Sequence, residues 1–173
     1  MSLHFNADGI LRMAEQIERN GEAFYRSAAA RIPDGAVKDR LLELAAMEAQ
    51  HQTTFGIVRN MLVSEEPHAP PYDPRGQTEM YLQDLAERHI FAKETPTELL
   101  AACLTPEEVL DVALRFERES VSFYTGLQSL VPAALGRGNV ELIVDEEREH
   151  VAILEAEKQR LVAARTGASS RNA

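Results

Sequence analysis

The sequence predicts an all-α protein: a four-helix bundle of two repeated antiparallel helical hairpins joined by a long crossover. Three observations predict this fold. Apolar residues recur at the three- and four-residue spacing of helices, and β-branched runs are short. Residues of the first half recur in the second half at a constant separation of 99 positions, and a proline-rich segment divides the halves. Because each hairpin would bury its apolar face against the other, residues 1–165 are expected to form one domain.

The repeat includes polar and aromatic positions as well as apolar ones. Four residues recur in order, and these pairs are Glu18 and Glu117, Tyr25 and Tyr124, Glu48 and Glu147, and His51 and His150. Five more residues have identical partners: Leu11, Ala14, Arg19, Phe24 and Pro33. No gap is needed between residues 11 and 62 and their partners. Unrelated amphipathic helices of similar composition would not match polar residues in this order, so the repeat indicates a duplicated structural unit.

The first hairpin is expected at about residues 8–63. Asp8 can cap the first helix through its carboxylate. Pro33 and Gly35 end that helix, because proline cannot continue a helix and glycine favours a turn. The second helix then runs to about Ser64, where an acidic and proline-rich stretch begins.

The crossover is expected at residues 64–104. Residues 64–77 hold four prolines and a glycine, which favour an extended connection over a helix. A short extra helix is predicted at residues 78–91 and another helical turn at residues 97–103. Ferritin-like four-helix bundles join their second and third helices by a long crossover of this kind.

The second hairpin is expected at about residues 105–163. Thr105 can cap its first helix, and Glu108 completes a capping box with it. The last helix is predicted at about residues 140–163, after a glycine-containing turn. Residues 166–173 are small and polar, so we expect a disordered tail.

Composition and charge exclude several classes of function. The net charge of −10 disfavours nucleic-acid binding, which requires a basic face. The single cysteine, Cys103, excludes a disulfide within the chain and agrees with a reducing compartment such as the cytoplasm. The first five residues lack the pattern of a signal peptide, and no apolar stretch is long enough to span a bilayer. We therefore expect a cytoplasmic protein without a nucleic-acid or membrane partner.

The repeated acidic and imidazole residues form a candidate site for two metal ions. It consists of Glu18, Glu48, His51, Glu117, Glu147 and His150. In each Glu-x-x-His pair, the carboxylate and the imidazole lie one turn apart on one helix face. Glu18 and Glu117 lie on apolar stripes, where a buried carboxylate needs a partner. Four glutamates and two histidines can enclose two ions in a bundle core, and this donor set suits iron or manganese, and zinc with less preference.

Another interpretation applies to each residue taken alone. The Glu-x-x-His string is not specific, because Glu65 and His68 also match it within the proline-rich connection. The glutamates could be solvated helix edges paired with arginines such as Arg19 or Arg118, and the histidines ordinary core residues. For one residue this alternative is favoured, whereas the whole symmetric set favours metal binding.

Two tyrosines lie seven residues after the lone glutamates, two helical turns further on the same face. The hydroxyls of Tyr25 and Tyr124 could hydrogen-bond the ligand carboxylates or simply belong to core-filling side chains. Acidic residues without consistently acidic repeat partners are assigned to the surface: Glu22, Glu119, Glu146, Glu149 and Glu155. Histidines without a repeat partner receive no role: His4, His68 and His89.

The sequence resembles the rubrerythrin family of ferritin-like diiron-carboxylate proteins over residues 8–163. The matching motifs are Glu18 with Phe24-Tyr25, Glu48-Ala49-Gln50-His51, Glu117 with Phe123-Tyr124, and Glu147-Arg148-Glu149-His150. The resemblance implies two iron ions held by the six candidate ligands, and peroxidase or oxidase activity with electrons from rubredoxin. The chain has no Cys-x-x-Cys pair, so only the helical domain is expected, without a rubredoxin-like domain. Ser120 stands where the best-known members carry an extra glutamate.

The expected function is therefore that of a diiron oxidoreductase, which reduces hydrogen peroxide or dioxygen. Electrons would come from a separate donor such as a rubredoxin, and no catalytic residue is expected beyond the metal ligands. Two alternatives remain open: an iron-binding ferroxidase or storage protein, and a non-enzymatic module stabilised by its metal ions. An exposed apolar helix face would support a homodimer.

Overall fold

Four long helices dominate the computed structural model, which describes residues 7–33, 35–64, 80, 81, 84, 89 and 94–169. The helices are α1 (Ala7–Arg31), α2 (Ala36–Ser64), α6 (Pro106–Gln128) and α7 (Arg137–Ser169). A short helix, α5 (Pro96–Ala102), and a single 3-10 turn, η1 (Ala133–Leu135), complete the described elements. No strand occurs in these ranges, and the predicted all-α four-helix bundle is confirmed.

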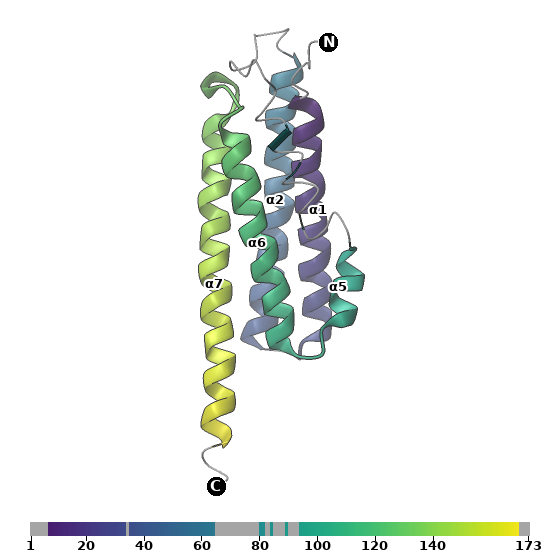
Figure 1. Ribbon diagram of the computed structural model, residues 1–173, viewed down its shortest axis with the longest axis vertical. Helices are drawn as coiled ribbons and strands as arrows, with labels where there is room; N and C mark the ends of the chain where they lie inside the picture. The colour runs from purple at the N-terminus through teal and green to yellow at the C-terminus, as the bar shows by residue number, and fades with distance from the viewer. Residues whose placement is uncertain are drawn as a thin grey trace.

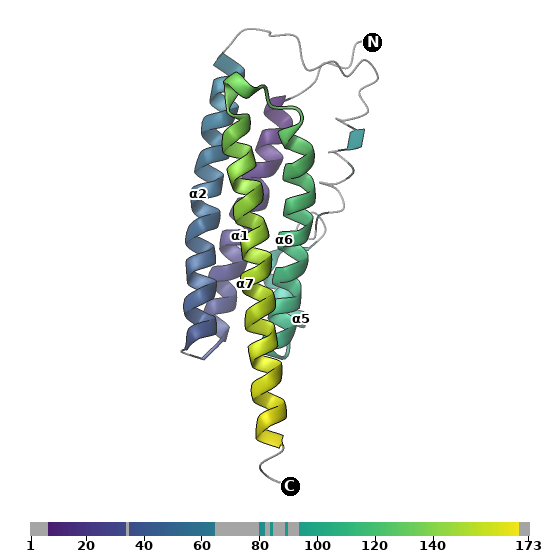
Figure 2. The ribbon, with the colours of Figure 1, turned by 90° about the vertical axis from the view of Figure 1, so that its left-hand side faces the viewer.

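The four helices pack as two hairpins. α1 packs mainly against α2, and α6 packs mainly against α7, while α1 also contacts α6 and α2 contacts α7. Neighbouring helices run antiparallel, and α7 projects beyond the end of the bundle where α1 and α2 are joined (Figures 1 and 2). α2 ends and α6 begins at opposite ends of the bundle (Figure 1), so the crossover must span its length.

Capping residues fix where the crossover ends. Thr105 accepts a hydrogen bond from the Glu108 backbone, and the Glu108 carboxylate accepts one from the Thr105 backbone, as the sequence predicts. α5 begins with an equivalent capping box between Thr95 and Glu98, which the sequence analysis missed. Arg31 donates to the carbonyls of residues 100 and 103, and so holds α5 against the end of α1. Most of the helix predicted at residues 78–91 lies outside the described residues.

α7 is longer at both ends than the sequence predicted. It begins at Arg137, directly after Gly136, whose φ of 107° few other residues adopt easily. It continues to Ser169, so residues 166–169 are helical where a disordered tail was expected. The physical reason is that residues 163–165 are good helix formers and no proline follows them. The rest of the predicted tail lies outside the described residues.

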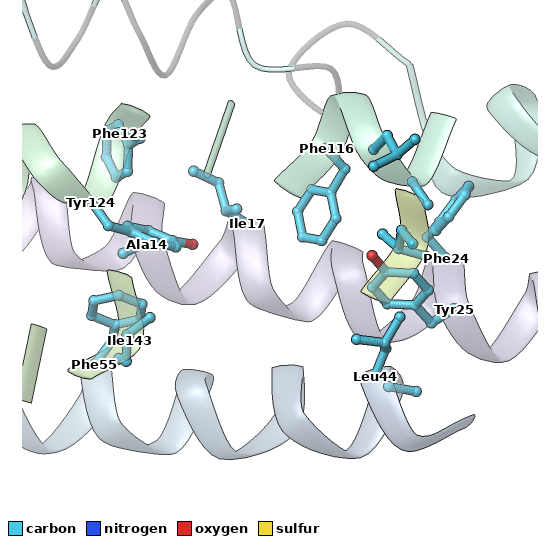
Figure 3. Close-up of a cluster of buried hydrophobic side chains, with 14 of the residues drawn as sticks. Ala14, Ile17, Phe24, Tyr25, Leu44, Phe55, Phe116, Phe123, Tyr124 and Ile143 are labelled. Carbon is cyan, nitrogen blue, oxygen red and sulfur yellow. The ribbon is translucent and has the colours of Figure 1, made fainter. Parts of the chain in front are cut away.

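Two aromatic clusters related by the repeat lie in the core. In one, the Tyr25 ring centroid lies 5.4 Å from that of Phe24 and 5.9 Å from that of Phe116. In the other, the Tyr124 centroid lies 5.6 Å from that of Phe123 and 4.7 Å from that of Phe55. The two tyrosine hydroxyls point toward each other from these clusters (Figure 3). The clusters therefore form apolar walls on two sides of a central polar region.

No helix in the described part of the chain combines enough length with enough apolar character to cross a lipid bilayer.

Candidate metal centre

The six predicted ligands meet in the interior of the bundle. α1 and α6 each supply one glutamate, and α2 and α7 each supply a Glu-x-x-His pair. The side chains of all six are at most 3% exposed. The alternative in which these glutamates are solvated helix edges is therefore wrong, because water does not reach them.

The ligand atoms form two overlapping groups. Glu18 and His51 form one group with Glu48 and Glu147, and each residue offers an atom within 4.8 Å of the other three. A second group with the same limit combines Glu117 and His150 with Glu48 and Glu147. Glu48 and Glu147 thus lie between two positions, each of which has one further glutamate and one histidine. Such an arrangement can hold two cations side by side.

Both histidines turn the same ring nitrogen toward the carboxylates. Nδ1 of His51 lies 2.9 Å from Glu147 Oε1 and 3.7 Å from Glu18 Oε2. Nδ1 of His150 lies 3.1 Å from Glu147 Oε2 and 3.5 Å from Glu117 Oε1. The rings are nearly parallel, with centroids 5.6 Å apart. Nδ1 is therefore the atom that each histidine would offer to an ion.

The buried carboxylates perturb one another strongly. Burial and the neighbouring charge of Glu147 raise the pKa of Glu48 and of Glu117 well above its ordinary value. Burial raises the pKa of Glu147 too, but hydrogen bonds to His150 and His51 outweigh burial, so the net direction is downward. Glu48 and Glu117 therefore favour the protonated, neutral form, because no solvent screens charge in this buried site.

The same carboxylates raise the pKa of both histidines and so favour their charged form. Burial lowers the pKa of His51, but the nearby carboxylates of Glu147 and Glu18 outweigh it and raise the pKa to about 11. Burial is likewise outweighed at His150, where Glu117 and Glu147 raise the pKa to about 10. Without metal, both histidines therefore remain protonated and positively charged. A bound metal ion would displace these protons.

Buried polar atoms that lack a hydrogen-bond partner indicate whether the cluster fits metal ions. Among the described residues, every buried side-chain nitrogen or oxygen without a hydrogen-bond partner belongs to a predicted ligand or to Tyr124. Both carboxylate oxygens of Glu18 and of Glu48 are in this state. Each such atom costs about 1–3 kcal/mol unless something satisfies it. The carboxylate and imidazole donors suit iron, manganese or zinc, so the residues fit two such ions.

The two tyrosines differ in their contacts. The Tyr25 hydroxyl donates a hydrogen bond to Oε1 of Glu117, on the other hairpin. The Tyr124 hydroxyl is buried and has no hydrogen-bond partner among the described residues. Burial and the charge of Glu18 raise the pKa of Tyr124 well above its usual value, so this hydroxyl keeps its proton beside the cluster. The repeat thus places equivalent tyrosines, and Tyr25 holds a ligand carboxylate by this hydrogen bond.

Glu146 belongs to the site, although the sequence analysis assigned it to the surface. Its Oε2 atom lies 2.8 Å from Nε2 of His51, the ring nitrogen that faces away from the cluster. The side chain is 49% exposed, so Glu146 links the buried ring to the surface. The repeat gives no sign of this contact, because the equivalent residue in the first hairpin is Met47. The sequence feature that could have indicated a role for Glu146 is its position directly before the predicted ligand Glu147. Other acidic residues form surface ion pairs, as with Glu22, Glu119 and Glu155.

His89 is a second residue near the site that the sequence analysis left without a role. It comes from the crossover and is buried, with its ring centroid 5.6 Å from that of Phe116. Its Nε2 atom lies 3.3 Å from the hydroxyl of Ser120, which is also buried. Burial lowers the pKa of His89 to about 4, so the ring is neutral. No sequence signal could place it, because the crossover has no repeat partner.

The positions three residues after the lone glutamates are small in both hairpins. A Cβ atom on Gly21 would lie 2.5 Å from Cζ of Phe116 and 3.4 Å from Cδ of Glu48. Ser120, the equivalent residue, contacts His89 instead. Each hairpin therefore fills this space differently, although the ligands beside it match.

The fold and the site together define a ferritin-like helical bundle with a buried carboxylate–histidine cluster. No family model and no curated protein matches the chain. Among solved structures, it resembles the crystal structure of a candidate ferritin-like diiron-carboxylate protein from Thermotoga maritima, with 26% sequence identity and a TM-score of 0.61. The match covers 92% of this chain and 98% of that chain. The predicted ferritin-like fold is confirmed.

Proposed function

We propose that the chain binds two iron ions and acts as a rubrerythrin-type oxidoreductase, which reduces hydrogen peroxide or dioxygen. The observation that carries the proposal is the pair of buried ligand groups that share Glu48 and Glu147. The description of the similar Thermotoga maritima protein as a diiron-carboxylate protein favours iron over manganese or zinc. Two ferrous ions would supply two electrons and Lewis acidity to the oxygen species.

The protein would bind the ions, orient their ligands and exclude water. Tyr25 holds the Glu117 carboxylate by a hydrogen bond, and Glu146 holds the His51 ring. The buried aromatic side chains around the ligands would keep solvent away from the ions. Electrons would come from a separate donor such as a rubredoxin, because the chain has one cysteine and no Cys-x-x-Cys pair. We propose a cytoplasmic location, which agrees with a single cysteine and no disulfide within the chain. The net charge of −10 supports the proposal that the protein binds neither nucleic acid nor a membrane.

The test is a ferrous loading experiment followed by peroxide. Metal-free protein is titrated with ferrous ion in the absence of oxygen, and we expect two ions per chain. One equivalent of hydrogen peroxide should then oxidise both ions, because one peroxide takes two electrons and two protons to give two waters. Glu48→Ala should lose this reaction, whereas Glu149→Ala, at an exposed neighbour on α7, should keep it. A loaded ferrous protein that peroxide leaves unchanged contradicts the proposed reaction.

The same preparation separates the two alternatives. Iron storage requires a closed shell of many subunits, so a homodimer, which we propose, would exclude it by light scattering. In a non-enzymatic module, removal of metal would unfold the bundle and peroxide would cause no spectral change.

A further inference from the structure

The two histidines of the cluster differ in what holds their outer nitrogen. Nε2 of His51 lies 2.8 Å from Oε2 of Glu146. Nε2 of His150 is buried and has no hydrogen-bond partner in the described part of the chain. The repeat places Met47, an apolar residue, where Glu146 stands in the other hairpin. Among the described residues, the hairpins therefore supply matching ligands but one supporting carboxylate, Glu146.

A supporting carboxylate changes the ligand that it contacts. When Glu146 accepts the Nε2 proton, the ring orientation is fixed and the Nδ1 lone pair is left for a metal ion. That Nδ1 atom already lies 2.9 Å from Glu147 Oε1, in the middle of the cluster. The hydrogen bond also makes the imidazole a stronger donor. No described residue supports the His150 ring in this way, so its ring gains neither effect from them.

Glu18 and Glu117, the two glutamates that each belong to a single ligand group, also differ in their hydrogen bonds. Oε1 of Glu117 already accepts a hydrogen bond from the Tyr25 hydroxyl, which competes for its electron density. Both oxygens of Glu18 are buried without any hydrogen-bond partner among the described residues. Glu18 therefore has more to gain from a cation than Glu117 has. Both differences favour the position formed by Glu18 and His51.

We propose that the two metal positions are inequivalent and fill in order. The first ion binds between Glu18 and His51 because Glu146 positions His51 for it, and the second ion binds between Glu117 and His150. This inference rests on the proposed binding of two ions. It gives Glu146 the role of a positioning residue that acts through His51.

Stepwise titration with cobalt(II) tests the order, because bound cobalt reports its coordination by visible absorption. The full chain should bind two ions in two resolved steps. Glu146→Gln should weaken the first step about 10–100-fold and change the spectrum of the first ion. Glu146→Asp should restore part of the affinity. Glu149→Gln, an exposed change on the same helix, should leave both steps unchanged.

Single-position variants identify which ion Glu146 serves. Glu117→Ala should retain the tighter step, and adding Glu146→Gln to it should weaken that step about 10–100-fold. Glu18→Ala should retain the weaker step, and adding Glu146→Gln to it should change nothing. Equal steps in the wild type, or equal weakening of both steps by Glu146→Gln, would overturn the ordered filling while leaving two-ion binding intact. Failure to bind a second ion at all would overturn the proposed function as well.

Discussion

The α1–α2 hairpin and the α6–α7 hairpin supply the same ligands, but the groups that surround those ligands differ. Each hairpin provides one glutamate and one Glu-x-x-His pair, and all six side chains are buried. Around them, Glu146 has Met47 as its counterpart, and Ser120 has Gly21. The comparison teaches that the symmetric part of the site defines where ions can bind. The asymmetric part decides how the two positions differ.

The largest expected effect is on the number of ions bound, and it differs between a glutamate that belongs to both ligand groups and one that belongs to a single group. Glu147 belongs to both ligand groups, whereas Glu18 belongs to one. Glu147→Ala should therefore abolish binding of both ions, and Glu18→Ala should leave one ion per chain. Elemental analysis after dialysis measures the ratio. If both variants kept one ion, Glu147 would not lie between the two positions.

The next effect concerns the space beside the lone glutamates. Gly21→Ala should lower the free energy of unfolding by about 1–2 kcal/mol, because overpacking costs about 1–3 kcal/mol and helix propensity returns up to about 1 kcal/mol. The cause is the 2.5 Å approach of the new Cβ to the buried Phe116 ring. Denaturant unfolding measures the change. Ser120→Ala adds no volume and should cost about 1 kcal/mol or less through its hydrogen bond to His89.

A matched glycine provides the control for that prediction. A Cβ on Gly56, in the middle of α2, would meet nothing closer than 3.9 Å. Gly56→Ala should therefore raise the free energy of unfolding by about 0.5–1 kcal/mol. Equal effects of the two glycine substitutions would show that the Phe116 contact does not constrain the first hairpin.

The pH dependence of the metal-free protein is the third expected effect. His51 and His150 have folded-state pKa values of about 11 and about 10, against an ordinary value of 6.5. Their contribution to stability is complete below pH 6.5 and is lost as the pH rises toward 10 and 11. The raised pKa of Glu48 acts with the same sign, complete below its ordinary 4.5 and lost at higher pH.

Thermal unfolding measures this dependence. Between about pH 6.5 and 9, we expect the Tm of the metal-free protein to fall by at least about 2 °C, because a loss of about 1 kcal/mol corresponds to about 2–4 °C in a chain of this length. Metal-loaded protein should show no such fall, because metal binding displaces these protons. A Tm of the metal-free protein that rises over this range would show that its histidines are neutral in the folded state.

The smallest effect compares the tyrosines. Tyr25→Phe removes the hydrogen bond to Glu117 and should cost the metal-free protein about 1 kcal/mol, because the carboxylate is left without this donor. Tyr124→Phe removes a hydroxyl that has no partner among the described residues, so it should be neutral or slightly stabilising. Chemical denaturation of both variants measures the two changes in the free energy of unfolding. Equal losses would mean that Tyr124 also holds a ligand.

The sequence was enough to predict the bundle and the meeting of six side chains, because both follow from helical periodicity and a fixed repeat. Proline and capping residues also located the turns well, as at Thr105. The roles of Glu146 and His89 could not be predicted, because neither has a chemically similar repeat partner. Their contacts depend on how helices rotate against each other and on the path of the crossover. The end of α7 was missed because no local stop signal marks it.

The position of the ligands along the chain has a consequence for folding. Each hairpin is closed by a short turn, so α1–α2 and α6–α7 can form from local contacts. The cluster itself needs residues as distant as Glu18 and His150, and it brings four carboxylates together only when the hairpins dock. The cost of burying these carboxylates away from water then opposes the last step of folding, and a divalent ion would relieve it. Docking of the hairpins, rather than helix formation, is thus the step that metal should accelerate in stopped-flow refolding.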